Sequence, residues 1–471
     1  MAEGEAAEAA RDLEALARWA AAVRPEQVPP AVRAAAALVV ADDWAAMVAG
    51  GGEPEVQAVW RTLAAAAGAG ESTVWAAGAP RADRFTAAQV NAVAGCWLEL
   101  DEGYRLATCH AGLYTVPAAL AEAEATGAGL EECVTAVAVA YEVAARVARA
   151  WTLPPLRLHP HGLLSPLGAA VASGHLLGLD GDAMVGAVTA ALASGIASPY
   201  SHAVGGALVR NAWAGWGARI GMQAAHFAPA GVAGLAGAAD DVLTHILAGR
   251  PDPAQLTQEL GEAWAVSDGY HKVYACCQYA HSAVEAALEV RARLGDGAGS
   301  TEIDAVEVQT HPLGLSLTEV EPKTTLAAKF SLPHAVAAAL VLGSGGREAF
   351  THEAIDDPRV ARLRRRVALR PIEGPLVWPH DRPARVAVRL GDGRVLEADC
   401  PSALGGPDRP LDEEAVWAKV RSLTADAFPS AADQLRRALA AVTAGETEGR
   451  RPVRELAAAL AAAGRTAEED A

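Results

Sequence analysis

Apolar residues recur with the period of an α-helix over the first half of the chain. Between residue 13 and about residue 265, segments rich in Ala, Leu and Val follow one another, separated by Pro and Gly groups such as those at 29–30 and 50–52. This spacing predicts helices that are partly or fully buried. The clearest of them are expected at residues 86–94, 116–125, 130–150, 166–177 and 217–228. We therefore expect one large helical domain here.

The pattern changes after residue 300, where short segments show the alternation and the β-branched residues of strands. Strands are expected at residues 303–310, 367–372, 386–388 and 395–398, with a hairpin signal at Asp392 and Gly393 before the last of them. Predicted helices at 282–294 and 334–342 would pack on this sheet. From residue 413 the pattern is helical again, so the chain is expected to return to the first domain.

The composition supports a mainly α fold. Hydrophobic residues make up 52% of the sequence, much of it alanine, and aromatic residues only 5%, which favours close-packed helices over a β-sandwich. Pattern and composition together predict a large all-helical domain formed by both chain ends, with a smaller α+β domain inserted between them. The expected boundaries are residues 1–268 for the helical domain, 269–411 for the α+β domain and 412–471 for the returning helices.

Charge and cysteine usage exclude several classes of function. The net charge of −18 and the pI of about 5.2 argue against a nucleic-acid partner. The N-terminus is acidic and lacks the pattern of a signal peptide, and the apolar stretch at 183–199 is typical of a buried helix, so we expect a cytoplasmic protein with no membrane partner. The six cysteines form no CxxC pair, and we expect no metal and no cofactor.

Four loop segments carry the residue types that would bind an anionic substrate and move protons. The first holds Glu99, Asp101 and Glu102 shortly before His110, the second is His159-Pro160-His161-Gly162, the third contains Arg210, and the fourth contains Lys272, Tyr274 and His281 around Cys276 and Cys277. Each segment also has a structural interpretation: a charged loop can cap a helix, and a histidine can satisfy buried carbonyls. A Cys277–His281 nucleophile pair is conceivable, but adjacent cysteines are more often core residues.

Read together, these segments resemble the MmgE/PrpD family. The resemblance runs from residues 38–51 through Asn91-Ala-Val-Ala-Gly, the four loop segments and Pro166-Leu-Gly-Ala-Ala to the segment at 327–334 and the closing helices. It implies that the smaller domain is a lid over the helical domain, that the active site lies between the two, and that the protein is a homodimer. It also implies site roles for Glu99, Asp101, His110, His159, Lys272 and His281, while His334 takes the place where many relatives carry a tyrosine.

The departures from the family pattern bear on the substrate. Arg210 stands where relatives commonly have a lysine, Trp213 replaces a histidine, and Glu99 replaces an aspartate. An arginine binds a carboxylate well but is a poor proton donor. These changes are consistent with an altered pocket and with an acid other than the usual tricarboxylates.

We therefore expect a cofactor-independent lyase that removes a proton next to a carboxylate of a small hydroxy acid and expels water. His110 or His159 would transfer protons, and Arg210 with Lys272 would bind the carboxylate. The other candidate contacts to the substrate are Glu102, His161, Trp213, Tyr274 and His334. Decarboxylation or epimerisation on the same scaffold is the alternative, and a catalytically inactive binding protein is the second alternative.

Overall fold

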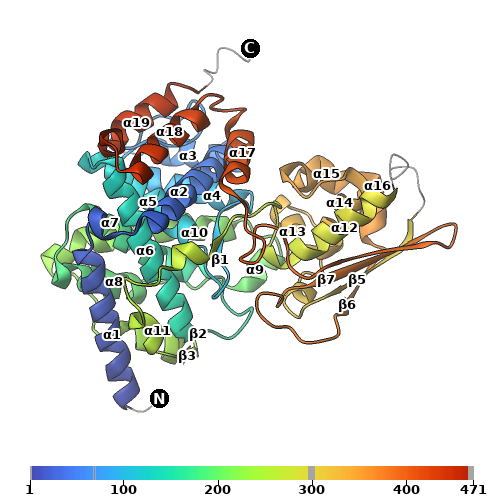
Figure 1. Cartoon of the computed structure of the whole chain (residues 1–471), viewed down its shortest axis with the longest axis horizontal. Coiled ribbons are helices and arrows are strands. Elements are labelled where there is room, and N and C mark those ends of the chain that lie inside the picture. Colours follow the sequence, from blue (N-terminus) through green and yellow to red (C-terminus); the bar gives the residue numbers. More distant parts are fainter. Residues whose placement is uncertain (1–2, 67, 69, 295–302, 465–471) are drawn as a thin grey trace.

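Most of the N-terminal half is a bundle of helices (Figure 1). The structure is a computed structural model that describes residues 3–66, 68, 70–294 and 303–464. The helices of this bundle are α1 (Glu3–Ala22), α2 (Pro30–Gly50), α3 (Pro54–Ala64), α4 (Arg84–Trp97), α5 (Ala111–Thr126), α6 (Leu130–Ala150), α7 (His161–Leu176), α8 (Gly181–Ala193), α9 (Tyr200–Val204), α10 (Val209–Phe227) and α11 (Ala254–Thr257). Two short antiparallel pairs join its loops: β1 (Gly103–Tyr104) with β4 (Gly269–Tyr270), and β2 (Trp151–Thr152) with β3 (Arg250–Pro251).

Small residues allow the central helices α5, α7 and α10 to pack at close range. A Cβ added at Gly221 of α10 would lie 2.1 Å from the carbonyl oxygen of Pro166 in α7. A Cβ at Gly168 of α7 would lie 2.9 Å from the carbonyl oxygen of Tyr114 in α5. Because these helices are rich in alanine and glycine, their backbones can come into direct contact in the core, where large side chains would keep them apart.

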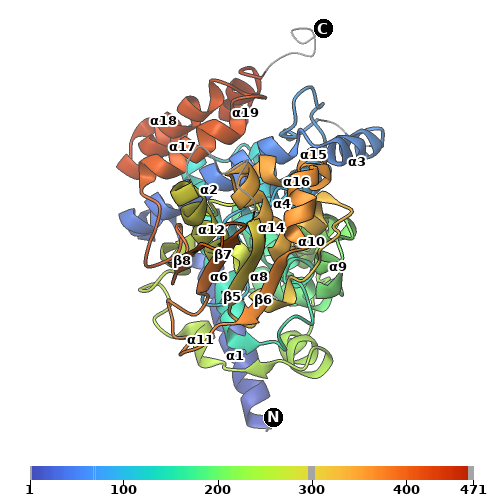
Figure 2. The same ribbon diagram turned by 90° about the vertical axis from the view of Figure 1, so that its right-hand side faces the viewer.

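The smaller part of the chain is a four-stranded sheet covered by helices. The strands are β5 (Ile303–Thr310), β6 (Val367–Pro371), β7 (Ala384–Leu390) and β8 (Val395–Cys400), in the order β6-β5-β7-β8 that Figure 2 displays. β5 and β6 are parallel, and the other pairs are antiparallel. The helices are α12 (His281–Leu294), α13 (Thr325–Lys329), α14 (Leu332–Leu342), α15 (His352–Asp356) and α16 (Pro358–Arg364), of which α12 packs on β7 and β8 and α14 packs on β6.

The C-terminal helices pack on the N-terminal bundle. They are α17 (Glu413–Thr424), α18 (Ala431–Ala444) and α19 (Val453–Ala461); α17 and α18 contact α2, and α19 contacts α5 (Figure 1). Lys419 of α17 lies 2.6 Å from a carboxylate oxygen of Asp42 in α2, and that carboxylate is fully buried. A buried ion pair of this kind fixes how α17 sits on the bundle.

The mainly α character expected from the sequence is confirmed. The predicted domain boundaries and the role of the smaller part as a lid stay predictions. Over the described ranges, no helix has both the length and the apolar character needed to cross a bilayer.

Candidate functional site

The loop between α4 and α5, residues 98–110, carries the first group of predicted site residues. The side chain of Asp83 caps the start of α4 by accepting hydrogen bonds from the backbone of Phe85 and Thr86. At the other end of the loop, α5 begins directly after His110. Gly112 in its first turn is required, because a Cβ there would lie 2.0 Å from a carboxylate oxygen of Asp43. This close approach holds the loop and His110 against the buried face of α2.

Glu99 has a strained backbone, with φ at 55°. The left-handed conformation costs a residue with a side chain roughly 1–2 kcal/mol, and such strain is common at functional sites. The strained backbone aims the carboxylate at two cations: Arg210 pairs with one oxygen, and the Lys272 ammonium lies 3.2 Å from the other. The ion pairs therefore offset the strain.

Asp101 completes a buried charge network. Its Oδ1 lies 3.3 Å from Nζ of Lys272, and all four charged side chains of the network are at most 2% exposed. Burial raises the pKa of Glu99 and of Asp101, but the neighbouring cations outweigh this and hold both pKa values below their usual range. The same carboxylates raise the pKa of Lys272 against the effect of burial. Lys272 therefore stays charged and cannot act as a base.

The Asp101 carboxylate orients His110. Nδ1 of His110 lies 2.8 Å from Oδ2 of Asp101 and 3.2 Å from the carbonyl oxygen of Glu102. Both neighbours are acceptors, so Nδ1 must carry the ring proton of the neutral imidazole. This leaves the lone pair of Nε2 unused, and His110 lines a cavity. The geometry is that of a general base held in the reactive tautomer.

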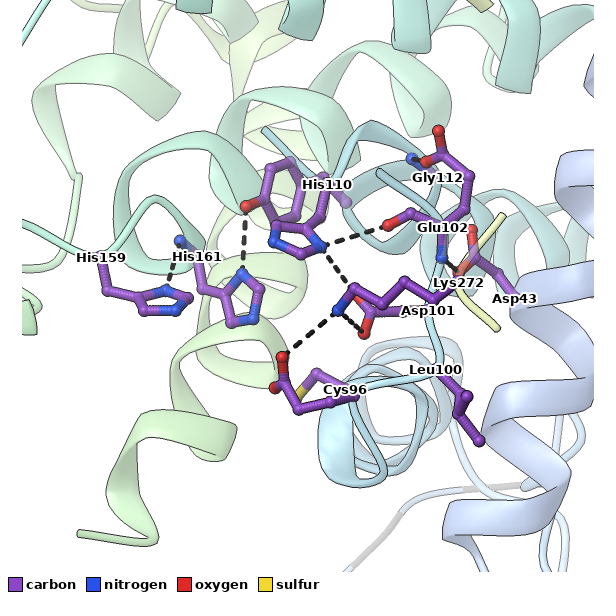
Figure 3. Close-up of polar contacts among 12 residues, drawn as sticks. Asp43, Cys96, Leu100, Asp101, Glu102, His110, Gly112, His159, His161 and Lys272 are labelled. Atoms are coloured by element: carbon purple, nitrogen blue, oxygen red, sulfur yellow. Dashed lines mark hydrogen bonds and ion pairs between the residues drawn. The ribbon is translucent and has the colours of Figure 1, made fainter. Parts of the chain in front are cut away.

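His159 and His161 lie beside His110 and are held neutral. Figure 3 shows the three rings next to one another, with ring centroids 5.1 Å apart for His110 and His161 and 4.3 Å apart for His159 and His161. Burial, followed by the charge of Arg210, lowers the pKa of both histidines well below the usual value. Nε2 of His159 accepts a hydrogen bond from Nε of Arg210 at 3.2 Å. His159 therefore positions Arg210, and its Nε2 is not available as a base in this arrangement.

The cavity beside His110 is small. Its volume is about 40 Å³, which holds a few water molecules at most, so the wall must move to admit a carboxylic acid. The loop between β6 and β7 contributes Arg382 to the wall. Next to it, Asp381 pairs with Arg105, and Trp378 stacks on the Arg105 guanidinium at 5.1 Å. The wall consists of Glu99, Tyr104, Ala107, Thr108, Cys109, His110, His159, Pro160, Tyr200, Arg210, Tyr270, Lys272, Cys277, Gln278, Tyr279, Phe330 and Arg382.

The structure brings some of the predicted site residues to this wall and places others behind it. Those in the wall are Glu99, His110, His159, Arg210 and Lys272. Buried behind it are Asp101, Glu102, His161 and Trp213. Asp101 acts through His110 and Lys272, His161 accepts or donates a hydrogen bond with the Tyr114 hydroxyl at 3.0 Å, and the Trp213 ring packs on His159 at 6.1 Å.

Three other predicted residues, Tyr274, His281 and His334, do not line this wall. Nε2 of His334 lies 2.9 Å from the carbonyl oxygen of Ala349, within the smaller part of the chain. Nε2 of His281 lies 3.2 Å from the carbonyl oxygen of Cys276. The Tyr274 ring packs on the His281 ring, with their centroids 5.3 Å apart. Burial lowers the pKa of His281 to about 3. In this structure the two histidines contact backbone carbonyl oxygens, and Tyr274 packs in the core.

The wall also contains residues that the sequence did not single out. Arg382 stacks on Tyr279 at 5.0 Å, and Phe330 packs under the guanidinium of Arg210 at 5.2 Å. Phe330 and Tyr279 stand inside segments that match the family pattern, so their position there was a usable signal. Arg382 lies in a Pro-rich loop with no such signal, and only the fold brings it to the cavity.

Both candidate cysteines are protonated thiols. Burial raises the pKa of Cys276 well above the usual value and that of Cys277 to about 11. His281 contacts the backbone of Cys276 and not the thiol of Cys277, so the pair lacks the base that an activated thiol needs. Within the described part of the chain, no group of three or more His, Cys, Asp or Glu side chains is placed to hold a metal ion.

Two buried carboxyls behind the site are held in the protonated form. Burial, outweighing the hydrogen bonds from Tyr141 and Gly112, raises the pKa of Glu102 to about 8, and burial also raises that of Asp43 well above the usual value. These two carboxyls then bind more protons in the folded state than in the unfolded state, for Glu102 between about pH 4.5 and pH 8, so their contribution to the free energy of unfolding falls as the pH rises through this window.

We expect Glu102→Gln to remove part of this pH dependence. The amide keeps the shape of the carboxyl but cannot ionise. Between pH 5 and pH 8, the free energy of unfolding should therefore fall by about 2–4 kcal/mol less in the variant than in the wild type. Urea unfolding at a series of pH values measures this. Equal pH dependence in the two proteins would show that Glu102 is ionised in the folded state.

Comparison with known families covers most of the chain. Residues 14–242 match the MmgE/PrpD N-terminal domain, and residues 274–444 match the MmgE/PrpD C-terminal domain. No curated protein matches the chain with statistical significance. The two matches confirm the resemblance seen in the loop segments.

Proposed function

The chain belongs to the MmgE/PrpD family, and from this premise we propose that it is a lyase that eliminates water from a small hydroxy acid without a cofactor. The observation that supports the proposal is the pair formed by Asp101 and His110. It leaves Nε2 of a correctly oriented imidazole in a cavity that Arg210 and Lys272 line with positive charge. A base beside two fixed cations is what removal of a proton next to a carboxylate requires.

The proposed reaction begins when the substrate carboxylate binds Arg210 and Lys272. The hydrogen bonds of Arg210 use Nε and Nη1, which leaves Nη2 to donate to the substrate. His110 takes the proton from the carbon next to the carboxylate, and negative charge develops on the carboxylate oxygens. Both cations keep their protons, so they stabilise this negative charge without protonating the intermediate. The strength of each contact increases as the charge develops.

The second step breaks the carbon–oxygen bond on the adjacent carbon. The electron pair left by the proton forms the carbon–carbon double bond, and the hydroxyl leaves with its bonding electrons. His110, now an imidazolium, returns the proton to the departing oxygen, so that water is released. His159 stays neutral and holds Arg210 in place.

Epimerisation shares the charged intermediate of this reaction, whereas decarboxylation leaves an electron pair on carbon as carbon dioxide departs. Both remain the alternatives, because the family supports several outcomes on one scaffold. Product analysis separates the three. Elimination gives an unsaturated acid and water that carries the hydroxyl oxygen, as ¹⁸O labelling would show. Released carbon dioxide, or inverted configuration with no loss of mass, would replace elimination by one of the alternatives. Saturable binding with no conversion of any bound acid would favour the inactive binding protein.

We expect activity to survive exhaustive treatment with a chelator. The proposed chemistry uses only side chains of this protein, and its cations are Arg210 and Lys272. Turnover before and after dialysis against EDTA measures this, with added Zn²⁺, Mg²⁺ and Fe²⁺ as controls. A loss of activity that one of these ions restores would refute the cofactor-free reaction.

A further inference from the structure

A second pocket, larger and mostly apolar, adjoins the cavity at His110. It lies between the C-terminal end of α6, the segment 151–160 and the start of α7, and its volume is about 260 Å³. Its wall includes Leu106, Leu153, Leu156, Leu158, Leu164 and Leu313. Arg149 is the only charged residue that the described part of the chain contributes to this wall, and its guanidinium is already bonded to Gln255.

The apolar pocket and the cavity share part of their walls. Ala107, Thr108, Pro160, Tyr200 and Tyr279 line both. A molecule that places its carboxylate against Arg210 and Lys272 can therefore extend directly into the apolar pocket once the cavity opens. Side by side, the two spaces offer a charged end and an apolar end.

The charge balance at the cavity wall matches a substrate with a single negative charge. At the wall and next to it, four cations form ion pairs with three carboxylates: Arg105, Lys272, Arg210 and Arg382 against Glu99, Asp101 and Asp381. One carboxylate from the substrate would balance the remaining positive charge. A tricarboxylate would leave two charges uncompensated in a buried site, which is costly.

We propose that the substrate is a hydroxy monocarboxylic acid whose apolar substituent occupies the pocket lined by Leu106, Leu153 and Leu156. This inference rests on the proposed function for the identity of the reacting end. The volume sets the size of the substituent: an apolar cavity of about 150 Å³ accepts benzene, so about 260 Å³ accepts a group somewhat larger than a phenyl ring, such as a chain of six to eight carbons.

Two series of acids test the proposal on the full-length protein. Unreactive saturated acids from butanoate to decanoate measure binding by calorimetry, and 3-hydroxy acids of the same lengths, with citrate and malate for comparison, measure kcat/KM. Burial of each methylene should improve both quantities by about fourfold until the pocket is full. A flat response to chain length, or binding of citrate in preference to octanoate, would overturn the proposal.

Variants in the wall of the apolar pocket test whether the preference for long chains arises there. Leu153→Trp should fill the pocket and reduce the preference for octanoate over butanoate by at least tenfold. Leu106→Asp should do the same by placing a charge at the mouth, and because Leu106 is 45% exposed this variant carries little risk to folding. Leu235→Asp is the matched control, since Leu235 is 79% exposed and lies outside the pocket. Unchanged preference in both wall variants would contradict the proposal.

The outcomes also separate this inference from the proposed function. If short hydroxy acids are dehydrated but chain length has no effect, the lyase reaction stands and the apolar subsite is refuted. If long acids bind tightly, with the expected loss in Leu106→Asp, and no acid in the series is converted, the subsite stands and the reaction is refuted.

Discussion

Replacing His110 with alanine should lower kcat by about 10³-fold while KM changes little. General acid–base catalysis by one side chain contributes on the order of 10²–10⁴-fold, and the group acts only in the transition state. In the proposed reaction His110 both removes the proton and returns it to the leaving hydroxyl, so no other group replaces it. Steady-state kinetics on the substrate found by product analysis measures the effect.

The Asp101–His110 pair provides a graded test of this role. Asp101→Asn keeps the shape of the side chain but removes the charge that fixes the Nδ1 proton of His110, so kcat should fall less than in His110→Ala and the pH profile of kcat should shift. His202→Ala is the control, because His202 is exposed and lies outside the cavity wall. A kcat within threefold of the wild type in His110→Ala would assign the base to another residue.

Arg210→Met should reduce kcat/KM by about 10²–10³-fold. The change removes a charge-assisted contact to the substrate carboxylate worth on the order of 2–4 kcal/mol, and that contact is strongest when charge develops on the carboxylate. Arg210→Lys should recover part of the loss, because the charge returns without the planar fork. Kinetics of the three proteins on one substrate provides the comparison.

Loss of stability must be separated from loss of function here. Arg210→Met leaves the carboxylate of Glu99, which is 1% exposed, with Lys272 as its main partner, and breaking a buried pair costs about 3–5 kcal/mol. Combining Arg210→Met with Glu99→Gln restores the charge balance, so the double variant should regain much of its stability without regaining activity. If the double variant is as active as the wild type, Arg210 serves only to neutralise Glu99.

Much of the fold follows from local sequence pattern, and two of the misplaced helix starts have a common cause. The predicted helix at 130–150 coincides with α6, but α5 and α7 begin five residues before the predicted starts. In both helices a proline, Pro117 or Pro166, lies inside the second turn. Proline commonly marks a helix start, so the pattern places the start too late. The error concealed that His110 and His161 stand at the N-terminal ends of two helices.

The sheet shows the limit of local reasoning more clearly. The alternation of apolar residues in β5 and β7 was sufficient to predict strands, because the residues on one face of each are buried. The parallel pairing of β5 with β6 could not be predicted, because it depends on the path of the intervening segment.

The residue types of the site were visible in the sequence, but their arrangement was not. Loop chemistry indicated His110, Arg210 and Lys272, and the structure places all three in one wall. The contact of His334 with the carbonyl oxygen of Ala349 could not be predicted, because position within a family pattern does not show which group a ring faces. Arg382 was missed because a charge far away in sequence becomes relevant only when the loop between β6 and β7 closes on the bundle.

The most direct test of the central claim is exchange of the proton next to the carboxylate in deuterated water. NMR would follow the acid series with the wild type and with His110→Ala at matched enzyme concentration. We predict that the wild type incorporates deuterium at this carbon or eliminates water from the same molecule, and that His110→Ala slows both by about 10³-fold. Turnover of a substrate that retains its original hydrogen at this carbon, or exchange at the wild-type rate in His110→Ala, would contradict the account.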